Sequence, residues 1–365
     1  MSGPSTTARR AAPDVTRALA LLGVIVMNYH GALNPEPEVD GFWDRLFHTS
    51  TGVLSTRFAA AFVMMAGVGV ALMASTASRP DVRDGLGAVR MRLARRGLLL
   101  YAVGLALNHA WGGTIIFYYG AYLLIAAFIV GASDLSLVTL GAVAVTAAAG
   151  IGAWLASRPA GSERIDWLDP REIDSLPDLI GRTFTGYTHP VLPWIAFLIA
   201  GIVLGRRLPD FQRRARSIAT IGSILTAVTY LILHFLSTTS AYDDPSNAAL
   251  FSTEPFRRGL GYSVTTVGII VTAFALICLV VERLEGSPVV RFLQRAGQMT
   301  LTAYLLHVLV FYALFRWWSV IDSRGLPTAV ITATLLWVVI VVGSSAWRAR
   351  FGLGPAERLY RLIGG

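Results

Sequence analysis

The sequence predicts an all-α polytopic membrane protein, a bundle of about ten transmembrane helices in a single integral membrane domain (residues 1–365). Hydrophobic residues make up 54% of the chain and charged residues only 15%, whereas a soluble domain carries about 25% charged residues. The mean hydropathy is +0.58. Continuous apolar runs recur along the whole chain, and about 20 such residues span a bilayer as a helix.

Ten spans are expected in chain order. The first follows a polar segment without the apolar core of a cleavable signal, so it is expected to act as the insertion signal itself. The second is rich in small residues that permit close helix packing. The fourth and fifth are separated by a two-residue turn, and the last five by arginine-rich or longer polar segments. The spans are 16–33, 54–75, 94–110, 114–132, 135–156, 189–205, 217–237, 262–281, 298–317 and 328–346.

The distribution of arginine predicts the orientation. All 31 basic residues are arginine. With a cytoplasmic N-terminus, the inner segments hold 21 arginines and 8 acids, and the outer segments hold 10 arginines and 14 acids. The positive-inside rule therefore favours cytoplasmic tails at both ends (1–15 and 347–365) and a multi-pass protein of a bacterial-type cytoplasmic (plasma) membrane.

This placement also explains the net charge of +9. The arginines lie between membrane spans and serve topology, so no nucleic-acid partner is expected. Two polar outer loops are expected, 157–188 and 238–261, and the first is long enough to act as a lid. The lipid bilayer is the expected partner, and small residues along the second span are compatible with a homodimer or with closure of the bundle.

Five of the six histidines fall at the outer ends of the spans. Titratable groups are costly near hydrocarbon, so this gathering indicates a site with chemistry at one surface, and histidine moves protons near neutral pH. An interfacial or solvent-exposed histidine is the competing interpretation for each one. These residues are His30, His48, His109, His189 and His234.

Asn28 and His30 end the first span, and His48 precedes the second. The amide of Asn28 must hydrogen-bond inside the bundle, either as a clamp between helices or as part of a site. Arg57, at the top of the second span, can snorkel or pair with a carboxylate. His307 is different, because it lies in the middle of the ninth span on the same helix face as Tyr304. An ionisable group at that depth is expected to face the bundle interior and to line a site or pore.

Motif searches exclude several mechanisms. The chain has no histidine or cysteine spacing typical of a metal site, so no metal is expected. It also lacks a phosphate-binding loop and a nucleophile elbow. The single cysteine, Cys278, lies in an apolar run, where it is expected to be a small buried hydrophobe.

Three stretches resemble the transmembrane acyltransferase superfamily, in particular the heparan-α-glucosaminide N-acetyltransferase-like and YeiB/DUF418 group. The first is RALALLGVIVMNY at Arg17–Tyr29, and the second is His48 with the span RFAAAFVMMAGVGVALM that follows it. The third joins residues 189–206, AGQMTLTAYLLH (296–307) and GPAERLYR (354–361). The segment IIFYYGAYLL (115–124) departs from the family pattern.

The resemblance implies an enzyme that takes an acyl group, such as acetyl, from cytoplasmic acetyl-CoA or another acyl-CoA. The enzyme delivers it to a glycan or other envelope acceptor at the outer face. His48 matches the catalytic histidine of the family and Asn28 its active-site asparagine, while His30 competes with His48 for the first role. Histidine can act as base or acyl carrier, and an asparagine amide can stabilise an oxyanion. Arginines at the cytoplasmic mouth could hold the CoA phosphates or serve topology alone; they are Arg17, Arg92, Arg95 and Arg96.

Two rival functions remain open from the residues. A proton-coupled secondary transporter or lipid translocator would use Asn28, Tyr304 and His307 as a midplane site. A structural subunit of an envelope complex would need none of this chemistry. Transport predicts ionisable groups that converge at the midplane. Acyl transfer predicts arginines at the inner mouth and His48 at the outer one.

Overall fold

A computed structural model describes residues 6–34, 41–77, 85–159, 165, 168, 170 and 172–365. In this part of the chain all regular elements are helical and none is a strand. The α-helices are α1 (Thr6–Leu33), α2 (Phe42–Phe47), α3 (Arg57–Ala77), α4 (Leu86–Ala110), α5 (Ile116–Ile129), α6 (Asp134–Ala156), α7 (Leu176–Phe184), α8 (Val191–Arg206), α9 (Leu208–Arg213), α10 (Ala215–Leu236), α11 (Pro245–Phe251), α12 (Leu260–Arg283), α13 (Pro288–Gly297), α14 (Thr300–Tyr312), α15 (Leu326–Phe351) and α16 (Pro355–Gly364). Two 3₁₀-helices, η1 (Ser240–Asp243) and η2 (Pro255–Arg257), and one π-helix, η3 (Ala313–Trp317), complete the set.

Each of the ten expected spans overlaps a helix, and the ninth overlaps both α14 and η3. Seven helices are long and apolar enough to cross a membrane, namely α1, α3, α6, α10, α12, α14 with η3, and α15. Helices α5 and α8 are apolar but shorter, and α4 has 25 residues with arginines in its first half. The chain is therefore an all-α polytopic membrane protein, as the sequence predicts.

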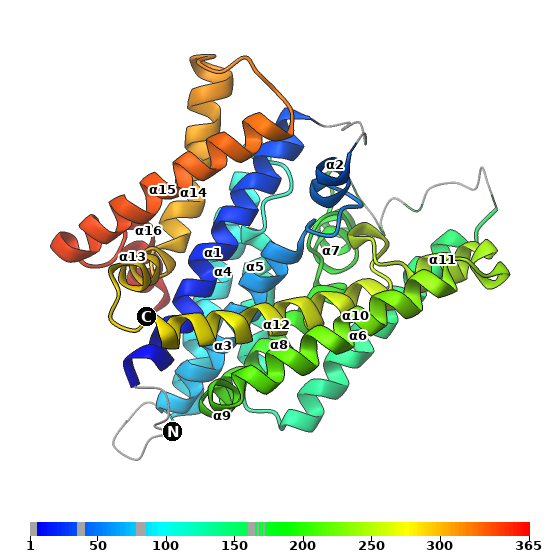
Figure 1. Ribbon diagram of the computed structural model, residues 1–365, viewed down its shortest axis with the longest axis horizontal. Coiled ribbons are helices and arrows are strands. Elements are labelled where there is room, and N and C mark those ends of the chain that lie inside the picture. The colour runs from blue at the N-terminus through cyan, green and yellow to red at the C-terminus, as the bar shows by residue number, and fades with distance from the viewer. Residues whose placement is uncertain are drawn as a thin grey trace. The chain divides into compact units, whose positions relative to one another are not determined.

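The chain divides into two compact units, which are described separately. Unit 1 comprises 1–62, 209–221 and 270–362, and unit 2 comprises 63–208, 222–269 and 363–365. In unit 1, α1 packs against α13, α14 and α15 (Figure 1). Val15 lies in a cluster of buried apolar side chains with Val290 of α13. The indole N–H of Trp337 donates to the carbonyl of Ala18 at 2.7 Å. Close packing of this helix face and the interhelical hydrogen bond of Trp337 both stabilise unit 1.

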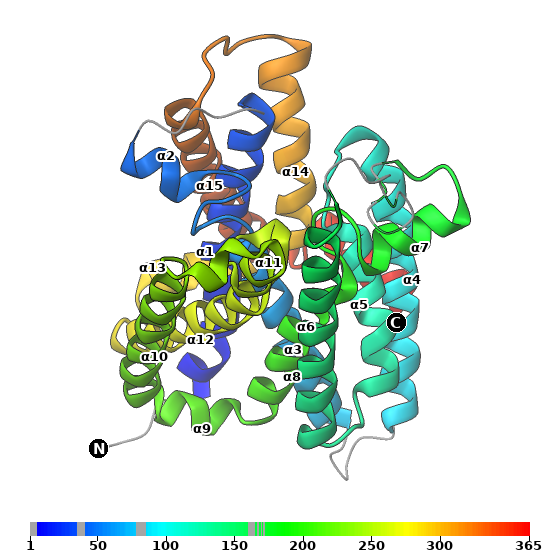
Figure 2. The same cartoon turned by 90° about the vertical axis from the view of Figure 1, so that its right-hand side faces the viewer.

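In unit 2, α4 packs along α5, and α6 lies beside α8 (Figure 2). Glycine permits close approach of backbones between α8 and α3 and between α5 and α4. A Cβ on Gly201 of α8 would lie 1.9 Å from the carbonyl oxygen of Met64, and one on Gly120 of α5 would lie 2.4 Å from the amide nitrogen of Tyr101. These distances are too short for any other residue, so small residues set the spacing of the helices.

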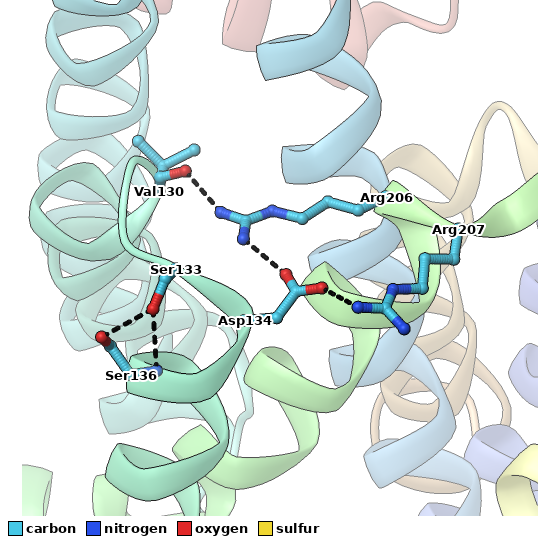
Figure 3. A network of polar contacts seen from close by, with 6 residues as sticks. All are labelled: Val130, Ser133, Asp134, Ser136, Arg206 and Arg207. Atoms are coloured by element: carbon cyan, nitrogen blue, oxygen red, sulfur yellow. Dashed lines mark hydrogen bonds and ion pairs between the residues drawn. The ribbon is translucent and has the colours of Figure 1, made fainter.

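A polar network joins the turn between α5 and α6 to the end of α8 (Figure 3). Asp134 pairs with Arg206 and Arg207, each at 2.7 Å, and Arg206 also donates to the carbonyl of Val130 at 2.9 Å. Ser133 caps α6 by accepting from the amide of Ser136 at 3.1 Å. The network brings together two segments that are both expected on the inner side, the two-residue turn 133–134 and the arginine-rich segment 206–216.

The segments expected as loops and tails contain structure of their own. Helix α7 lies in the expected outer loop 157–188, and η1, α11 and η2 lie in 238–261. The last span is longer than expected, since α15 continues to Phe351. After a turn at Gly352, the expected tail forms α16. The apolar pattern marks only the part of a helix that meets lipid, so polar extensions are not visible in hydropathy.

Candidate functional site

Three ionisable side chains of unit 1 come together at the end of α1. His30 lies in the last turn of α1, Asp44 in α2, and His48 directly after α2. Asp44 and His48 are both close enough to His30 to interact with it electrostatically. Gly31 of α1 faces Thr49, so the turn after His48 packs on the helix end. The structure thus brings together the two histidines that compete for the catalytic role.

The ring of His48 is held by the turn that follows it. Its Nδ1 accepts from the backbone amide of Thr51 at 3.1 Å, and the Thr51 hydroxyl lies 2.8 Å from the same nitrogen. A backbone amide can only donate, so Nδ1 carries no proton in this arrangement. Neutral His48 therefore carries its proton on Nε2 and presents a hydrogen-bond donor there.

His30 is deeply buried, with 2% of its surface exposed. Neither of its ring nitrogens has a hydrogen-bond partner among the residues that the structure describes. Buried polar atoms are rarely left unsatisfied, so each exception calls for an explanation, and a catalytic role is one such explanation. No hydrogen bond in the described residues assigns the tautomer of His30, in contrast with His48.

Two residues below His30, Asn28 joins α1 to α14. The amide Nδ2 of Asn28 lies 3.0 Å from Nε2 of His307. The other ring nitrogen of His307, Nδ1, faces the carbonyl of Tyr304 one turn earlier and must donate to it. Nε2 is then the acceptor and Asn28 the donor. Asn28 hydrogen-bonds inside the bundle, as expected.

Aromatic side chains enclose this pair. His307 is 0% exposed, and the hydroxyl of Tyr29 donates to its carbonyl at 2.8 Å. The ring of Tyr304 contacts the imidazole edge to face, with ring centres 4.7 Å apart. Phe311 packs against Tyr29, with ring centres 5.1 Å apart. His307 therefore faces the bundle interior, as the sequence predicts, and is held there from both helices.

Arg57 begins α3 and is buried with 4% exposure. Its Nη1 donates to the carbonyl of Ser55 at 3.0 Å. The preceding residue, Thr56, has a φ of 61°, and the next, Phe58, packs its ring on Gly23 of α1. Arg57 thus belongs to the turn that connects the His48 segment with α3.

Four arginines are expected to hold the acyl-CoA donor; one of them lies in unit 1 and three lie in unit 2. Arg17 of unit 1 pairs with Asp14 at 2.9 Å, and Gln298 connects Asp14 to Arg348 with hydrogen bonds of 2.9 and 3.0 Å. In unit 2, Arg96 donates to the carbonyl of Gly365 at 2.8 Å. The remaining two lie on the same helix as Arg96, where Arg92 is half-buried near Gly365 and Arg95 is exposed.

Sequence reasoning missed a second cluster in unit 2. Arg182 of α7 is 2% exposed and stacks 3.7 Å from the ring centre of Tyr187. Arg258, with a φ of 54°, donates to the carbonyls of Thr185 and Tyr187. Arg258 therefore joins the segment after η2 to the segment after α7. The aromatic run FYYGAY in α5 was the signal that could have pointed to this cluster.

His189 belongs to this second cluster and precedes α8. Its ring contacts Trp194, with ring centres 4.6 Å apart, and its carbonyl accepts from the hydroxyl of Tyr122. Burial, with a smaller contribution from the positive charge of Arg258, lowers the pKa of His189 to about 3. Its ring is therefore neutral at physiological pH. His109 and His234, which are also expected at outer ends of spans, are both exposed.

Glu357 is a further residue that sequence reasoning missed. Its carboxylate accepts from the amides of Leu301 and Thr302 at 2.8 and 3.0 Å, and from the Thr302 hydroxyl. These amides are unpaired donors of the first turn of α14, so Glu357 caps that helix. The cap physically joins the AGQMTLTAYLLH and GPAERLYR stretches. The sequence signal for this contact was the single acidic residue in GPAERLYR.

The arrangement of possible metal ligands does not indicate a metal site in the described residues. Within the described ranges, no group of three or more histidine, cysteine, aspartate or glutamate side chains is placed to hold an ion. The site is one of imidazole, carboxylate and amide groups.

These features define a class, a polytopic helical membrane protein with a histidine site at one end of its first helix. A family model described as "Heparan-alpha-glucosaminide N-acetyltransferase, catalytic" matches residues 9–231, and one described as "Protein of unknown function (DUF418)" matches residues 203–363. The first match spans more than half of the chain. The chain therefore belongs to the heparan-α-glucosaminide N-acetyltransferase catalytic family, a family of membrane acyltransferases. A search of curated proteins found no match.

Proposed function

We propose that the protein transfers an acyl group, such as acetyl, from cytoplasmic acetyl-CoA or a similar thioester to an envelope acceptor at the outer face. The observation that carries the proposal is the family match over residues 9–231, which includes Asn28, His30 and His48. A glycan hydroxyl or amine fits as acceptor, because a histidine base can activate either group.

The geometry of unit 1 supports separate roles for the two histidines. His30 has no hydrogen-bond partner on either ring nitrogen in the described structure and lies near Asp44, so it can take the proton of the attacking acceptor. Asp44 stabilises the imidazolium that forms. His48 has its Nδ1 engaged and donates from Nε2 to the oxyanion that develops on the thioester carbonyl. The C–S bond then breaks, and the CoA thiolate takes the proton from His30.

Asn28 acts through position in this mechanism. Asn28 lies two residues before His30 on α1, and its side-chain amide donates to Nε2 of His307 on α14. This contact fixes the end of α1, and with it the direction of the His30 ring. We therefore assign Asn28 and His307 to positioning, with Tyr304 and Tyr29 enclosing the pair.

Arginine side chains are proposed to contact the phosphates of the acyl-CoA donor. The guanidinium groups of Arg17, Arg92, Arg95 and Arg96 suit phosphate oxygens in geometry and charge. Arg17 also pairs with Asp14, so its engagement by CoA would compete with that ion pair. Cytoplasmic positions of both chain ends and of these arginines follow from the positive-inside rule and remain part of the proposal.

The test uses full-length protein in vesicles with acetyl-CoA labelled in the acetyl group. We expect His30→Gln to reduce label transfer or thioester hydrolysis by about 10²–10⁴-fold, as is usual for loss of a general base. We expect His48→Gln to reduce it by about 10²–10³-fold, as is usual for loss of one oxyanion donor. His234→Gln is the matched control, since that histidine is exposed, and it should retain activity. The proposal fails if the wild-type protein neither binds nor turns over acetyl-CoA.

The Asn28–His307 pair favours one alternative, a proton-coupled transporter with an interior polar site. Proton flux across the same vesicles separates the two functions. Flux that depends on His307 and persists without acetyl-CoA would support transport. Acetyl transfer without such flux would support the enzyme.

A further inference from the structure

Helix α16 is an amphipathic helix with one face fixed and the other exposed. Glu357 caps α14, and the amide of Ala356 donates to the Thr302 hydroxyl at 3.1 Å. Gly354 is buried beside this contact. The orientation of α16 is therefore set by the first turn of α14 and does not depend on its exposed side chains.

The exposed face of α16 combines apolar and basic groups. Leu359 is 55% and Leu362 82% exposed, and Arg358 and Arg361 are exposed beside them. Positions 358, 361 and 362 recur at the three- and four-residue spacing that places them along one side of a helix. Leucines exposed to this extent would be unfavourable in water.

The end of α15 continues the same chemistry. Trp347 and Phe351 are partly exposed, with ring centres 4.7 Å apart. Arg350 lies 5.6 Å from the ring centre of Phe351, and Arg358 donates to the carbonyl of Phe351. Tryptophan with arginine at the end of a spanning helix is typical of the boundary between headgroups and acyl chains.

The membrane position of this face follows from α14. Helix α14 begins a candidate span at Thr300, so its first turn lies at a membrane boundary, and Glu357 holds α16 to that turn. The exposed basic groups have one acid on their own helix, Glu357, and that carboxylate already accepts from the first turn of α14. An exposed face of this sign and composition is complementary to an anionic lipid surface.

We propose that α16 and the end of α15 form a binding surface for anionic phospholipid headgroups. Leu359 and Leu362 enter the upper acyl region, and Arg358 and Arg361 bind the headgroup phosphates. The surface is independent of the acyl-transfer site.

The chain offers a clean probe, because its single cysteine is buried. The variant Leu362→Cys is labelled with an environment-sensitive fluorophore and placed in vesicles of phosphatidylcholine mixed with phosphatidylglycerol. Brominated forms of each lipid then quench the label. We expect emission typical of the acyl boundary and stronger quenching by brominated phosphatidylglycerol, and this preference should fall as salt is raised.

Replacement of both arginines, Arg358→Gln with Arg361→Gln, should reduce the preference for phosphatidylglycerol by up to about 30-fold, because each arginine near an anionic surface contributes about 1 kcal/mol. The matched control is Arg316→Gln with Arg324→Gln, which removes the same charge from two exposed arginines outside α16. The control should keep the preference. Equal quenching by both lipids, or a label that stays in water, would overturn the proposal.

Discussion

The amide of Asn28 donates to Nε2 of His307 at 3.0 Å, across 279 positions of sequence. This contact joins the first and ninth expected spans and lies two residues from the histidine site at the end of α1. Because Nδ1 of His307 donates to the Tyr304 carbonyl, the donor and acceptor roles of the pair are fixed.

The first prediction concerns the energy of this pair. Asn28→Leu and His307→Leu should each destabilise the fold, because each leaves a polar partner unsatisfied in the interior. The double variant should be less destabilised than the sum of the two. We expect a coupling of about 0.6–1.7 kcal/mol, the range for interhelical hydrogen bonds in membranes. Unfolding of reconstituted protein checks it, and additive effects would contradict a direct contact.

The second prediction concerns the cap on α14. Glu357→Gln keeps the size of the side chain but removes its charge at the N-terminus of α14. The variant should lose about 1 kcal/mol of stability, since capping and dipole interactions are of that size. Thermal unfolding in detergent measures the loss. Glu282→Gln, at an exposed site, should change little, and equal effects of the two variants would rule out the cap.

The third prediction concerns the dependence of stability on pH. The pKa of His189 is lowered to about 3 in the folded protein, against about 6.5 in an unfolded chain. The unfolded state therefore binds more protons below pH 6.5, and stability falls as pH drops from about 6.5 toward 3. At pH 5 the loss should be about 1–2 kcal/mol.

His189→Gln should remove this part of the pH dependence while leaving stability at pH 8 closer to that of the wild type. Unfolding measured at pH 8 and at pH 5 on both proteins gives the comparison. His109→Gln is the control, since His109 is exposed. An unchanged pH slope in His189→Gln would assign the acid sensitivity to another group.

The fourth prediction concerns helix spacing in unit 2. Gly201→Ala places a Cβ 1.9 Å from the carbonyl of Met64, so α8 must move away from α3. We expect a loss of several kcal/mol, as for overpacked cores. Gly150→Ala in α6 meets no atom within 4 Å and should be neutral or slightly stabilising. Folded yield after extraction and thermal unfolding distinguish the two, and similar values would contradict the close packing.

The candidate site could be predicted only in part. Asn28, His30, His48 and His307 were visible because polar groups stand out in or beside apolar runs, where they are costly. Asp44 was not chosen, since a carboxylate in a polar loop is ordinary. Glu357, Arg182 and Arg258 were missed because charged residues are equally ordinary in polar segments. Their significance lies in the backbone groups that they meet.

The sequence by itself determined the class of protein and the positions of its apolar helices, and it predicted the side on which arginine gathers. Those properties depend on local hydropathy and charge, because each segment inserts into the bilayer according to its own apolar length and flanking charges. Only the tertiary structure decided that Asn28 meets His307, that Glu357 meets the first turn of α14, and that Thr51 directs the proton of His48 to Nε2. A hydrogen bond requires a donor and an acceptor within about 3 Å, and packing alone brings distant parts of the chain that close.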